Sequence, residues 1–297
     1  MPLRRLTLPE RYDLTSSFRA LYMKSAGRVV VDDDRIWRAT RTPEGPGTIS
    51  LARSGAVLLA EAWGPGADWL LETAPDLLGL RDDPGALVTH SGIVHELNRR
   101  QPGLRLGRTL RPFDVVMVAI LGQRVTGRQA ANAYRRLVGA YGEDAPGPHP
   151  LSLPPSPAQL ASLGYEDYHR FGVERVRASA LIEAARRVKR IEEINEMPRA
   201  AALRRLLAIR GIGPWTAASV MGIAWGDQDA VQTGDYHLPN TVAWALAGEA
   251  RAEDARMLEL LEPYAGQRRR VIVLIKGSGL RPPKYGPRTA MSAIEAI

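Results

Sequence analysis

The sequence contains no cysteine, only four lysines and no long apolar run. The absence of cysteine excludes disulfides, thiolate nucleophiles, zinc–thiolate sites and iron–sulfur clusters. No apolar stretch reaches the length of a membrane span, and the N-terminal residues lack the apolar segment of a secretory signal. We therefore expect a soluble, cytoplasmic protein with no membrane partner.

The charged residues are unbalanced in favour of positive charge. Lys and Arg number 40 against 32 Asp and Glu, which gives a formal net charge of +8. This excess suits a polyanionic partner, although a basic composition alone indicates one only weakly. Lysine occurs only at positions 24, 189, 276 and 284. A mechanism that needs a reactive amine therefore has few candidates.

The two parts of the chain differ in pattern. Short β-favouring runs between residues 28 and 64 are separated by turn signals, and a helical stretch at about 66–80 closes this part. From about residue 84 the apolar spacing is helical, apart from a proline-rich connection at 143–158. Further helices are predicted at 175–190, 199–209, 214–225, 239–247, 253–262 and 267–276. We predict a mainly α protein, with a smaller N-terminal α+β domain (antiparallel sheet) at 1–88 and a helical domain at 89–297.

The most informative stretch is an amphipathic helix that runs into Gly211-Ile212-Gly213, after which a second helix begins at Pro214. Proline suits this first position because its missing N–H would have been unpaired there. The glycines permit a tight hairpin with positive φ and a close backbone approach, and Ile212 can fill the space where the helices meet. The amides that open the second helix favour a phosphate, to which Thr216 could add a hydroxyl. A bare Gly-x-Gly turn with no ligand is the plainer alternative.

Asp235 follows Gly234 and precedes a helix expected to begin near Pro239. A carboxylate at such a place is commonly a helix cap or a solvated loop charge. Here it lies downstream of the hairpin, between a glycine and the aromatic pair Tyr236-His237. That combination makes Asp235 a candidate catalytic residue.

Three segments together carry a resemblance to a known family. Ile209–Ala217 and Gly234–His237 resemble the helix-hairpin-helix and Gly/Pro-Asp signature of the HhH-GPD DNA glycosylases. Gln101–Leu106, followed by Phe113 and Ala119–Thr126, resembles the bacterial 3-methyladenine DNA glycosylase II branch, the AlkA type. The resemblance implies two helical subdomains with the active-site cleft between them. It also implies a partner, double-stranded DNA containing damaged bases, which a monomeric, nucleoid-associated bacterial enzyme would bind.

The resemblance assigns roles to individual residues. Asp235 corresponds to the catalytic carboxylate, and Gly211, Ile212, Gly213 and Thr216 to the DNA-backbone anchor. Bifunctional relatives, which also cut the strand, carry a lysine two residues after the second hairpin glycine. This sequence has Trp215 there, with none of its lysines near. The implied enzyme is monofunctional, a hydrolase that excises alkylated purines in base excision repair.

Trp215 and Tyr236 match aromatic positions of the family's base pocket, where cation–π attraction selects a cationic base. Packing of the hairpin helix is an equally ordinary role for Trp215. Ser219 departs from the pattern, since AlkA-type enzymes place a tyrosine there, and the helix at 267–276 offers none of the later aromatic residues. The substrate range is therefore open, with oxidised or deaminated purines as an alternative. A non-catalytic helix-hairpin-helix binder of lesions is the alternative outside the enzymes.

Arg124 stands where AlkA-type enzymes place an apolar wedge that fills the vacated base stack. It could insert its guanidinium plane or contact a phosphate, and Gln123 is a weaker candidate for the same surface. No cofactor is expected to be required. The resemblance implies at most a structural monovalent cation, sodium or potassium, at the hairpin, held by the backbone carbonyls of Leu207, Ile209 and Ile212.

The chain has two groups of basic residues, of which the second could contact a duplex backbone. One comprises Arg170, Arg175, Arg177, Arg186, Arg187, Lys189 and Arg190, which is expected to be partly a solvated helix face. The other comprises Arg268, Arg269, Arg270, Lys276, Arg281 and Lys284. Binding through such residues should weaken steeply with salt.

Overall fold

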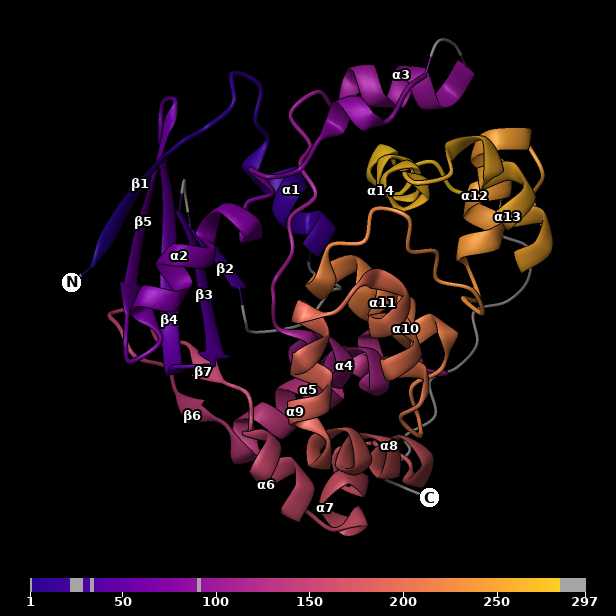
Figure 1. Cartoon of the computed structure of the whole chain (residues 1–297). Coiled ribbons are helices and arrows are strands. Elements are labelled where there is room, and N and C mark those ends of the chain that lie inside the picture. Colours follow the sequence, from indigo (N-terminus) through magenta and orange to yellow (C-terminus); the bar gives the residue numbers. More distant parts are fainter. Residues whose placement is uncertain (1, 22–28, 33–34, 90–91, 284–297) are drawn as a thin grey trace.

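The computed structural model describes residues 2–21, 29–32, 35–89 and 92–283. Lys24 and Lys284, two of the four lysines, lie outside this part. The chain forms a sheet-containing part on one side and two groups of helices on the other (Figure 1). The mainly α fold with a smaller N-terminal antiparallel sheet is thus confirmed.

The N-terminal sheet has five antiparallel strands in the order β1-β5-β4-β3-β2. The strands are β1 (Leu3–Thr7), β2 (Val29–Asp32), β3 (Arg35–Thr42), β4 (Gly45–Ser54) and β5 (Val57–Trp63). In β5 every second residue is buried, as a strand with one face on a core requires. Strand β1 escaped prediction because only one of its residues, Leu6, is buried. Its position at the sheet edge depends on pairing with β5.

Both faces of the sheet are covered. Helices α1 (Leu14–Leu21) and α2 (Ala67–Leu77) pack on one face, in a core that includes Ile49, Leu51 and Leu58. The other face carries Trp37 and Trp63, whose rings stack at 5.4 Å. The proline-rich segment forms the short hairpin β6 (Glu143–Asp144) and β7 (Ser152–Leu153), which packs against this face. A stretch predicted as a mere connection therefore ties the helices to the sheet.

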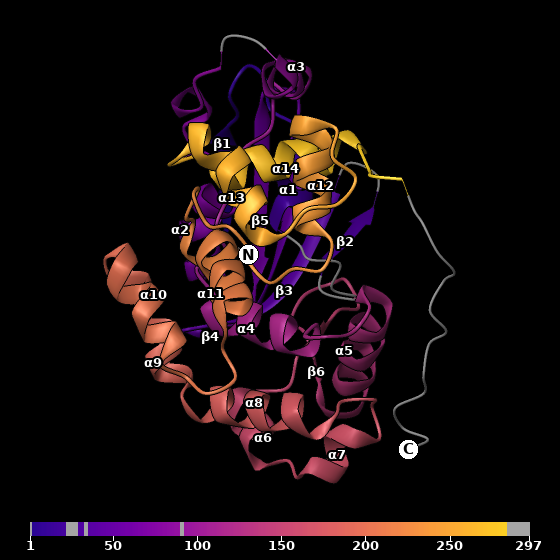
Figure 2. The same cartoon turned by 90° about the vertical axis from the view of Figure 1, so that its right-hand side faces the viewer.

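Two hydrophobic cores organise the helices (Figure 2). The first is built around α4 (Pro112–Leu121), α5 (Gly127–Tyr141), α6 (Pro157–Ser162), α7 (Tyr165–His169), α8 (Arg175–Arg186), α9 (Val188–Glu192), α10 (Arg199–Leu207) and α11 (Pro214–Val220). The second is built around α3 (Gly92–Arg100), α12 (Leu238–Ala247), α13 (Asp254–Leu261) and α14 (Arg268–Ser278). Helix α11 continues as a π-helical turn at Met221–Trp225, and short 3-10 turns lie at Pro84–Ala86, Glu193–Glu196 and Glu262–Tyr264. No helix in the described ranges is long and apolar enough to cross a membrane.

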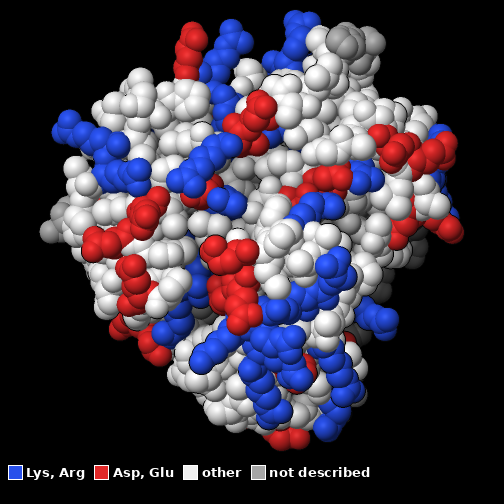
Figure 3. Space-filling view, in the orientation of Figure 1, with Lys and Arg blue, Asp and Glu red and all other residues white. Residues whose placement is uncertain are grey.

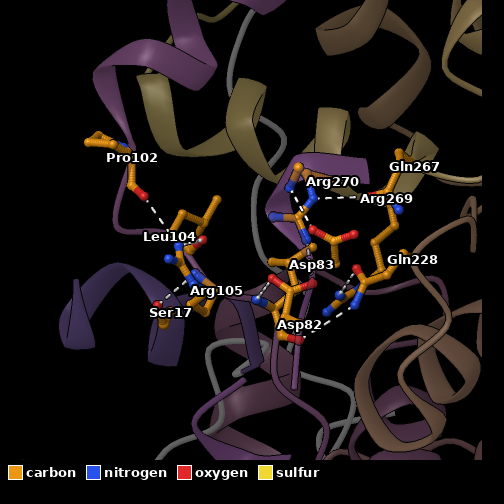
Figure 4. A network of polar contacts seen from close by, with 12 residues as sticks. Ser17, Asp82, Asp83, Pro102, Leu104, Arg105, Gln228, Gln267, Arg269 and Arg270 are labelled. Carbon is orange, nitrogen blue, oxygen red and sulfur yellow. Dashed lines mark hydrogen bonds and ion pairs between the residues drawn. The ribbon is translucent and has the colours of Figure 1, made fainter. Parts of the chain in front are cut away.

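A polar junction joins the sheet-containing part to the second helical group (Figure 4). The carboxylate of Asp82, which follows α2, pairs with Arg270 of α14, and both side chains are almost fully buried. Asp82 also accepts the amide N–H of Leu106 at 2.9 Å, and Arg270 donates Nε to Gln267 at 2.9 Å. Burying a charge is costly unless a partner compensates it. We therefore expect the junction to be stable only while both Asp82 and Arg270 are charged.

Replacing Asp82 with asparagine should destabilise the protein by about 3–5 kcal/mol, because the buried Arg270 guanidinium would lose its counter-charge. Urea unfolding followed by circular dichroism measures the change. Asp83→Asn is the matched control, since Asp83 is exposed and only caps a short turn through the Gly85 amide. We expect that control to stay within about 0.5 kcal/mol of wild type. Equal stability of the two variants would contradict the role given to the buried pair.

Candidate active site

The hairpin between α10 and α11 depends on its first glycine. Gly211 has φ +91°, and a Cβ there would lie 2.4 Å from the Cβ of Ala180 on α8. Gly213 has φ −89°, and a Cβ there would meet nothing within 4 Å. Ile212 is buried between the helices. Thus only Gly211 is required by the fold, whereas the space beside Gly213 stays open.

Helix α11 begins with amides that a ligand can use. Gly213 is the N-cap and Pro214 the first helical residue, and no side chain caps the helix. Within the described ranges the N–H groups of Gly213 and Trp215 have no hydrogen-bond partner. Such amides at a helix N-terminus suit an anion. The structure therefore leaves the predicted backbone anchor available.

Thr216 is buried beside that anchor. Its side chain is 1% exposed, and its hydroxyl accepts a hydrogen bond from Gln123 Nε2 at 3.0 Å. The same Nε2 donates to the carbonyl of Gly211 at 2.9 Å. The contact of the Thr216 hydroxyl with a phosphate stays a prediction. Gln123 binds the hairpin to the turn that follows α4.

Asp235 binds the start of α12 through one carboxylate oxygen and the hairpin helix through the other. Its Oδ1 accepts the amides of His237 and Leu238, both at 2.8 Å, at the start of α12. Its Oδ2 accepts the indole N–H of Trp215 at 2.9 Å. A cap alone would use one oxygen and leave the other to solvent. Here the second oxygen is directed at the hairpin helix, and the half-buried carboxylate is held in one orientation.

Trp215 reaches from Asp235 to the end of α4. Its Cη2 would lie 3.8 Å from a Cβ at Gly122, and its Nε1 donates to Asp235. The indole therefore borders both the carboxylate and the Gly122-Gln123-Arg124 turn. The structure brings together the sequence-predicted residues Asp235, Trp215 and Gln123, which come from three separate segments.

Arg124 lies in that turn with an unusual backbone. Its φ is +54°, one of two positive values among the described residues that are not glycine, and its side chain is exposed. Below the turn, the buried Arg177 donates to the Leu121 carbonyl at 2.8 Å. Non-glycine residues in this region are strained, and such strain gathers at functional sites. Arg177 therefore stabilises the turn from inside the fold, while the Arg124 side chain is exposed to solvent.

Tyr236 is exposed on the chain that follows Asp235. Its side chain is 86% exposed, and its ring packs edge-on against His237 at 4.8 Å between centroids. The capping bonds of Asp235 to His237 and Leu238 turn the chain immediately after the carboxylate. The place of Tyr236 in the base pocket stays a prediction.

Two features of the site escaped the sequence analysis. Ser219 Oγ accepts from Gln232 Nε2 at 2.7 Å, one helical turn beyond Trp215. In addition, desolvation lowers the pKa of Lys276 while the Asp235 carboxylate raises it, so the two groups lie within electrostatic reach. Neither feature has a local signal, because both depend on segments that are distant in sequence.

The basic residues are divided between surface and interior. Figure 3 shows Lys and Arg gathered over the face where α8, α9 and α10 lie. Exposed members there are Arg186, Lys189, Arg190 and Arg204. Arg177, Arg269 and Arg270, which were expected to face solvent or DNA, are buried. Their guanidinium groups bind two backbone carbonyls and the Asp82 carboxylate within the fold.

The carbonyls predicted to hold a cation can be tested for fit. Within the described ranges those of Leu207 and Ile212 accept no hydrogen bond, and that of Ile209 accepts only the Ile212 amide. A carbonyl oxygen has two lone pairs, so all three retain an acceptor position. No group of His, Cys, Asp or Glu that could hold a metal occurs among the described residues.

Comparison with known proteins agrees with this geometry. No protein-family model matches the sequence. The chain is 30% identical over 223 residues to a probable bifunctional transcriptional activator/DNA repair enzyme AlkA of Mycobacterium tuberculosis, a match that covers 70% of this chain and 43% of that protein. It is 30% identical over 176 residues to DNA-3-methyladenine glycosylase 2 of Escherichia coli, covering 59% and 61% of the two chains. The chain thus spans less than two thirds of the length of these curated relatives.

A solved structure shows the same fold. The 3-methyladenine DNA-glycosylase of Archaeoglobus fulgidus superposes with a TM-score of 0.78 at 19% identity, over 92% of this chain and 96% of that one. The fold of this chain is therefore the one seen in that glycosylase. In sequence, the chain is similar to AlkA-type DNA glycosylases.

The two hairpin glycines should respond differently to alanine. Gly211→Ala should lower the free energy of unfolding by about 2–4 kcal/mol, because it adds left-handed strain and a clash with Ala180. Gly213→Ala should leave stability within about 0.5 kcal/mol of wild type and weaken DNA binding instead, because its methyl group occupies the open space at the amides. Thermal unfolding and DNA titration measure the two effects. A stable Gly211→Ala protein would contradict the steric assignment.

Proposed function

We propose that this protein is a monofunctional DNA glycosylase that extrudes and hydrolytically removes alkylated purines of the 3-methyladenine and 7-methylguanine class. One observation carries the proposal: the Asp235 carboxylate is held between the start of α12 and the indole N–H of Trp215, next to the hairpin. A protein that only bound DNA would gain nothing from a carboxylate directed toward an anionic ligand. The sequence relatives support the same reaction class.

Asp235 suits the chemistry of base release. Cleavage of an N-glycosidic bond leaves positive charge on the sugar, which a nearby carboxylate stabilises. Three N–H donors fix the direction of this carboxylate before substrate arrives. A carboxylate offers about four acceptor positions, so one remains on Oδ2 for the attacking water. Preorganisation of this kind removes the cost of reorienting the group during the reaction.

Trp215 supports both the hydrolytic mechanism and the proposed substrate. It occupies the position where bifunctional relatives carry their Schiff-base lysine, so water is the proposed nucleophile. An alkylated purine is cationic, and the face of an indole attracts a cation. Oxidised or deaminated purines are neutral and would gain less from the same ring. These considerations favour alkylated over oxidised bases.

Duplex DNA would be held at the hairpin. The open amides of Gly213 and Trp215 would receive a phosphate, and the exposed basic residues of α8–α10 would neutralise others. A sodium or potassium ion on the carbonyls of Leu207, Ile209 and Ile212 would add positive charge behind that phosphate. If it acts on a bacterial chromosome, the protein would work in the cytoplasm.

Asp235→Asn should reduce base release by about 100-fold or more, because an amide cannot stabilise the developing positive charge. Affinity for undamaged duplex should change little, since the hairpin anchor is intact. Mass spectrometry of bases released from methylated DNA measures the reaction, with binding measured by fluorescence anisotropy. Asp254→Asn is the control, as Asp254 binds the Gly234 amide of the same loop.

Release at a near-native rate by Asp235→Asn would refute the catalytic assignment. The monofunctional assignment has its own check in the same samples. The DNA strand should break only after alkali is added, because hydrolysis leaves an intact abasic site. Strand breaks without alkali, lost on Lys276→Gln substitution, would show that an amine acts instead of water.

We further propose that Arg124 fills the space left by the extruded base. Its exposed side chain stands on a turn that is strained at Arg124 and anchored from below by Arg177. The neighbouring Gln123 binds this turn to the hairpin. A planar guanidinium can stack between bases and donate to the unpaired partner base. The turn is thus held at a fixed place relative to the phosphate anchor.

Arg124→Ala should slow base release from duplex DNA by about tenfold, while release from single-stranded DNA should stay unchanged. Only a duplex has a stack to be filled, and unstacking costs a few kcal/mol. Arg128→Ala is the control, because Arg128 is exposed at the start of the next helix. A phosphate contact would instead slow both substrates alike, which would rule out the wedge.

A further inference from the structure

Two hydrogen bonds connect one face of α11 to the loop that carries Asp235. Trp215 Nε1 donates to Asp235 Oδ2 at 2.9 Å, and Gln232 Nε2 donates to Ser219 Oγ at 2.7 Å. Trp215 and Ser219 are four residues apart and share a helix face. With a rise of 1.5 Å per residue, the backbone positions of Trp215 and Ser219 lie about 6 Å apart along α11. That spacing is comparable with the length of a purine from its glycosidic nitrogen to its exocyclic group.

The orientation of the Gln232 amide is determined by Ser219. A serine hydroxyl has one hydrogen to donate, and Ser219 donates it to the carbonyl of Trp215 at 2.9 Å. The hydroxyl oxygen can then only accept, so Gln232 must turn its NH₂ group toward it. The carbonyl Oε1 of Gln232 therefore points away from Ser219.

That carbonyl is accessible. Ser219 is 2% exposed, whereas Gln232 is half-buried. Among the described residues, Oε1 of Gln232 accepts no hydrogen bond, and it is not one of the buried side-chain atoms left without a partner. The amide thus presents an accessible acceptor of fixed direction in the loop that also carries Asp235.

We propose that Gln232 determines specificity by accepting a hydrogen bond from the exocyclic amino group of the extruded base. Resting on the proposed glycosylase function, this narrows the substrate class to alkylated adenines over alkylated guanines. Adenine carries an amino donor at C6, where guanine and hypoxanthine carry a carbonyl oxygen. An acceptor held against that carbonyl would leave both oxygens unpaired, which buried sites penalise.

The departure from the aromatic pocket pattern supports this reading. A tyrosine at position 219 would fill the place of the Gln232 amide with a ring. Serine leaves room for the amide and also fixes its direction. A polar group at this place can form a hydrogen bond with the edge of one kind of base. An apolar surface would accept any base of the right size.

3-Methyladenine and 3-methylguanine in dimethyl sulfate-treated DNA provide a matched pair of substrates. Both are N3-methylated cationic purines, and they differ at C6 in amino against carbonyl, as well as at C2. Mass spectrometry of released bases gives the ratio of their release rates. We expect wild type to favour 3-methyladenine by about tenfold more than the uncatalysed reaction does, the value of one hydrogen bond.

Two variants separate specificity from catalysis. Gln232→Leu should lose about tenfold in 3-methyladenine release and keep 3-methylguanine release, so that the preference disappears. Ser219→Ala should also reduce the preference, because the amide is then free to turn its NH₂ group toward a carbonyl. Thr233→Val is the control in the same loop, since the Thr233 side chain takes part in neither hydrogen bond, and it should preserve the wild-type ratio.

Unchanged ratios in both Gln232→Leu and Ser219→Ala would overturn the assignment of Gln232. In that case total base release would still be measurable, and the proposed function would stand. Absence of any enzymatic base release by wild type would overturn both proposals. Circular dichroism and affinity for duplex DNA establish that each variant is folded, and Ser219→Ala supplies the test if Gln232→Leu does not fold.

Discussion

The hydrogen bond between Trp215 and Asp235 is the contact on which the site depends, because it crosses between two hydrophobic cores. Helix α11, which carries Trp215, packs in the first helical core, and α12, which Asp235 caps, packs in the second. A shift between these groups would separate the indole from the carboxylate. The chemistry proposed here is therefore sensitive to contacts far from the base pocket.

One such distant contact is the buried pair of Asp82 and Arg270. It joins the chain leaving the N-terminal sheet to α14, which packs against α12 in the second core. A charged pair in the interior contributes little net stability, but it permits only an arrangement that brings both charges together. The pair therefore favours one placement of the second helical group, and so of Asp235.

The site combines a fixed carboxylate with a pocket less aromatic than the family pattern. Trp215 remains beside Asp235, whereas Tyr236 is exposed and position 219 carries a serine. A hydrogen bond joins Ser219 to Gln232 instead. Attraction for a cationic base would then come from one indole face, and discrimination between bases from a hydrogen bond. Such a site would accept fewer kinds of base and discriminate more strongly between them.

Local rules were sufficient for the hairpin, most helices and the candidate carboxylate, because glycine freedom, Pro214 at a helix start and apolar periodicity act within a few residues. The family resemblance also followed from such short segments. Only the tertiary structure placed β1 at the sheet edge and buried Arg177, Arg269, Arg270 and Thr216. These outcomes, like the bond from Gln232 to Ser219, depend on partners distant in sequence. Burial and hydrogen bonding between distant segments leave no periodic signal in the chain.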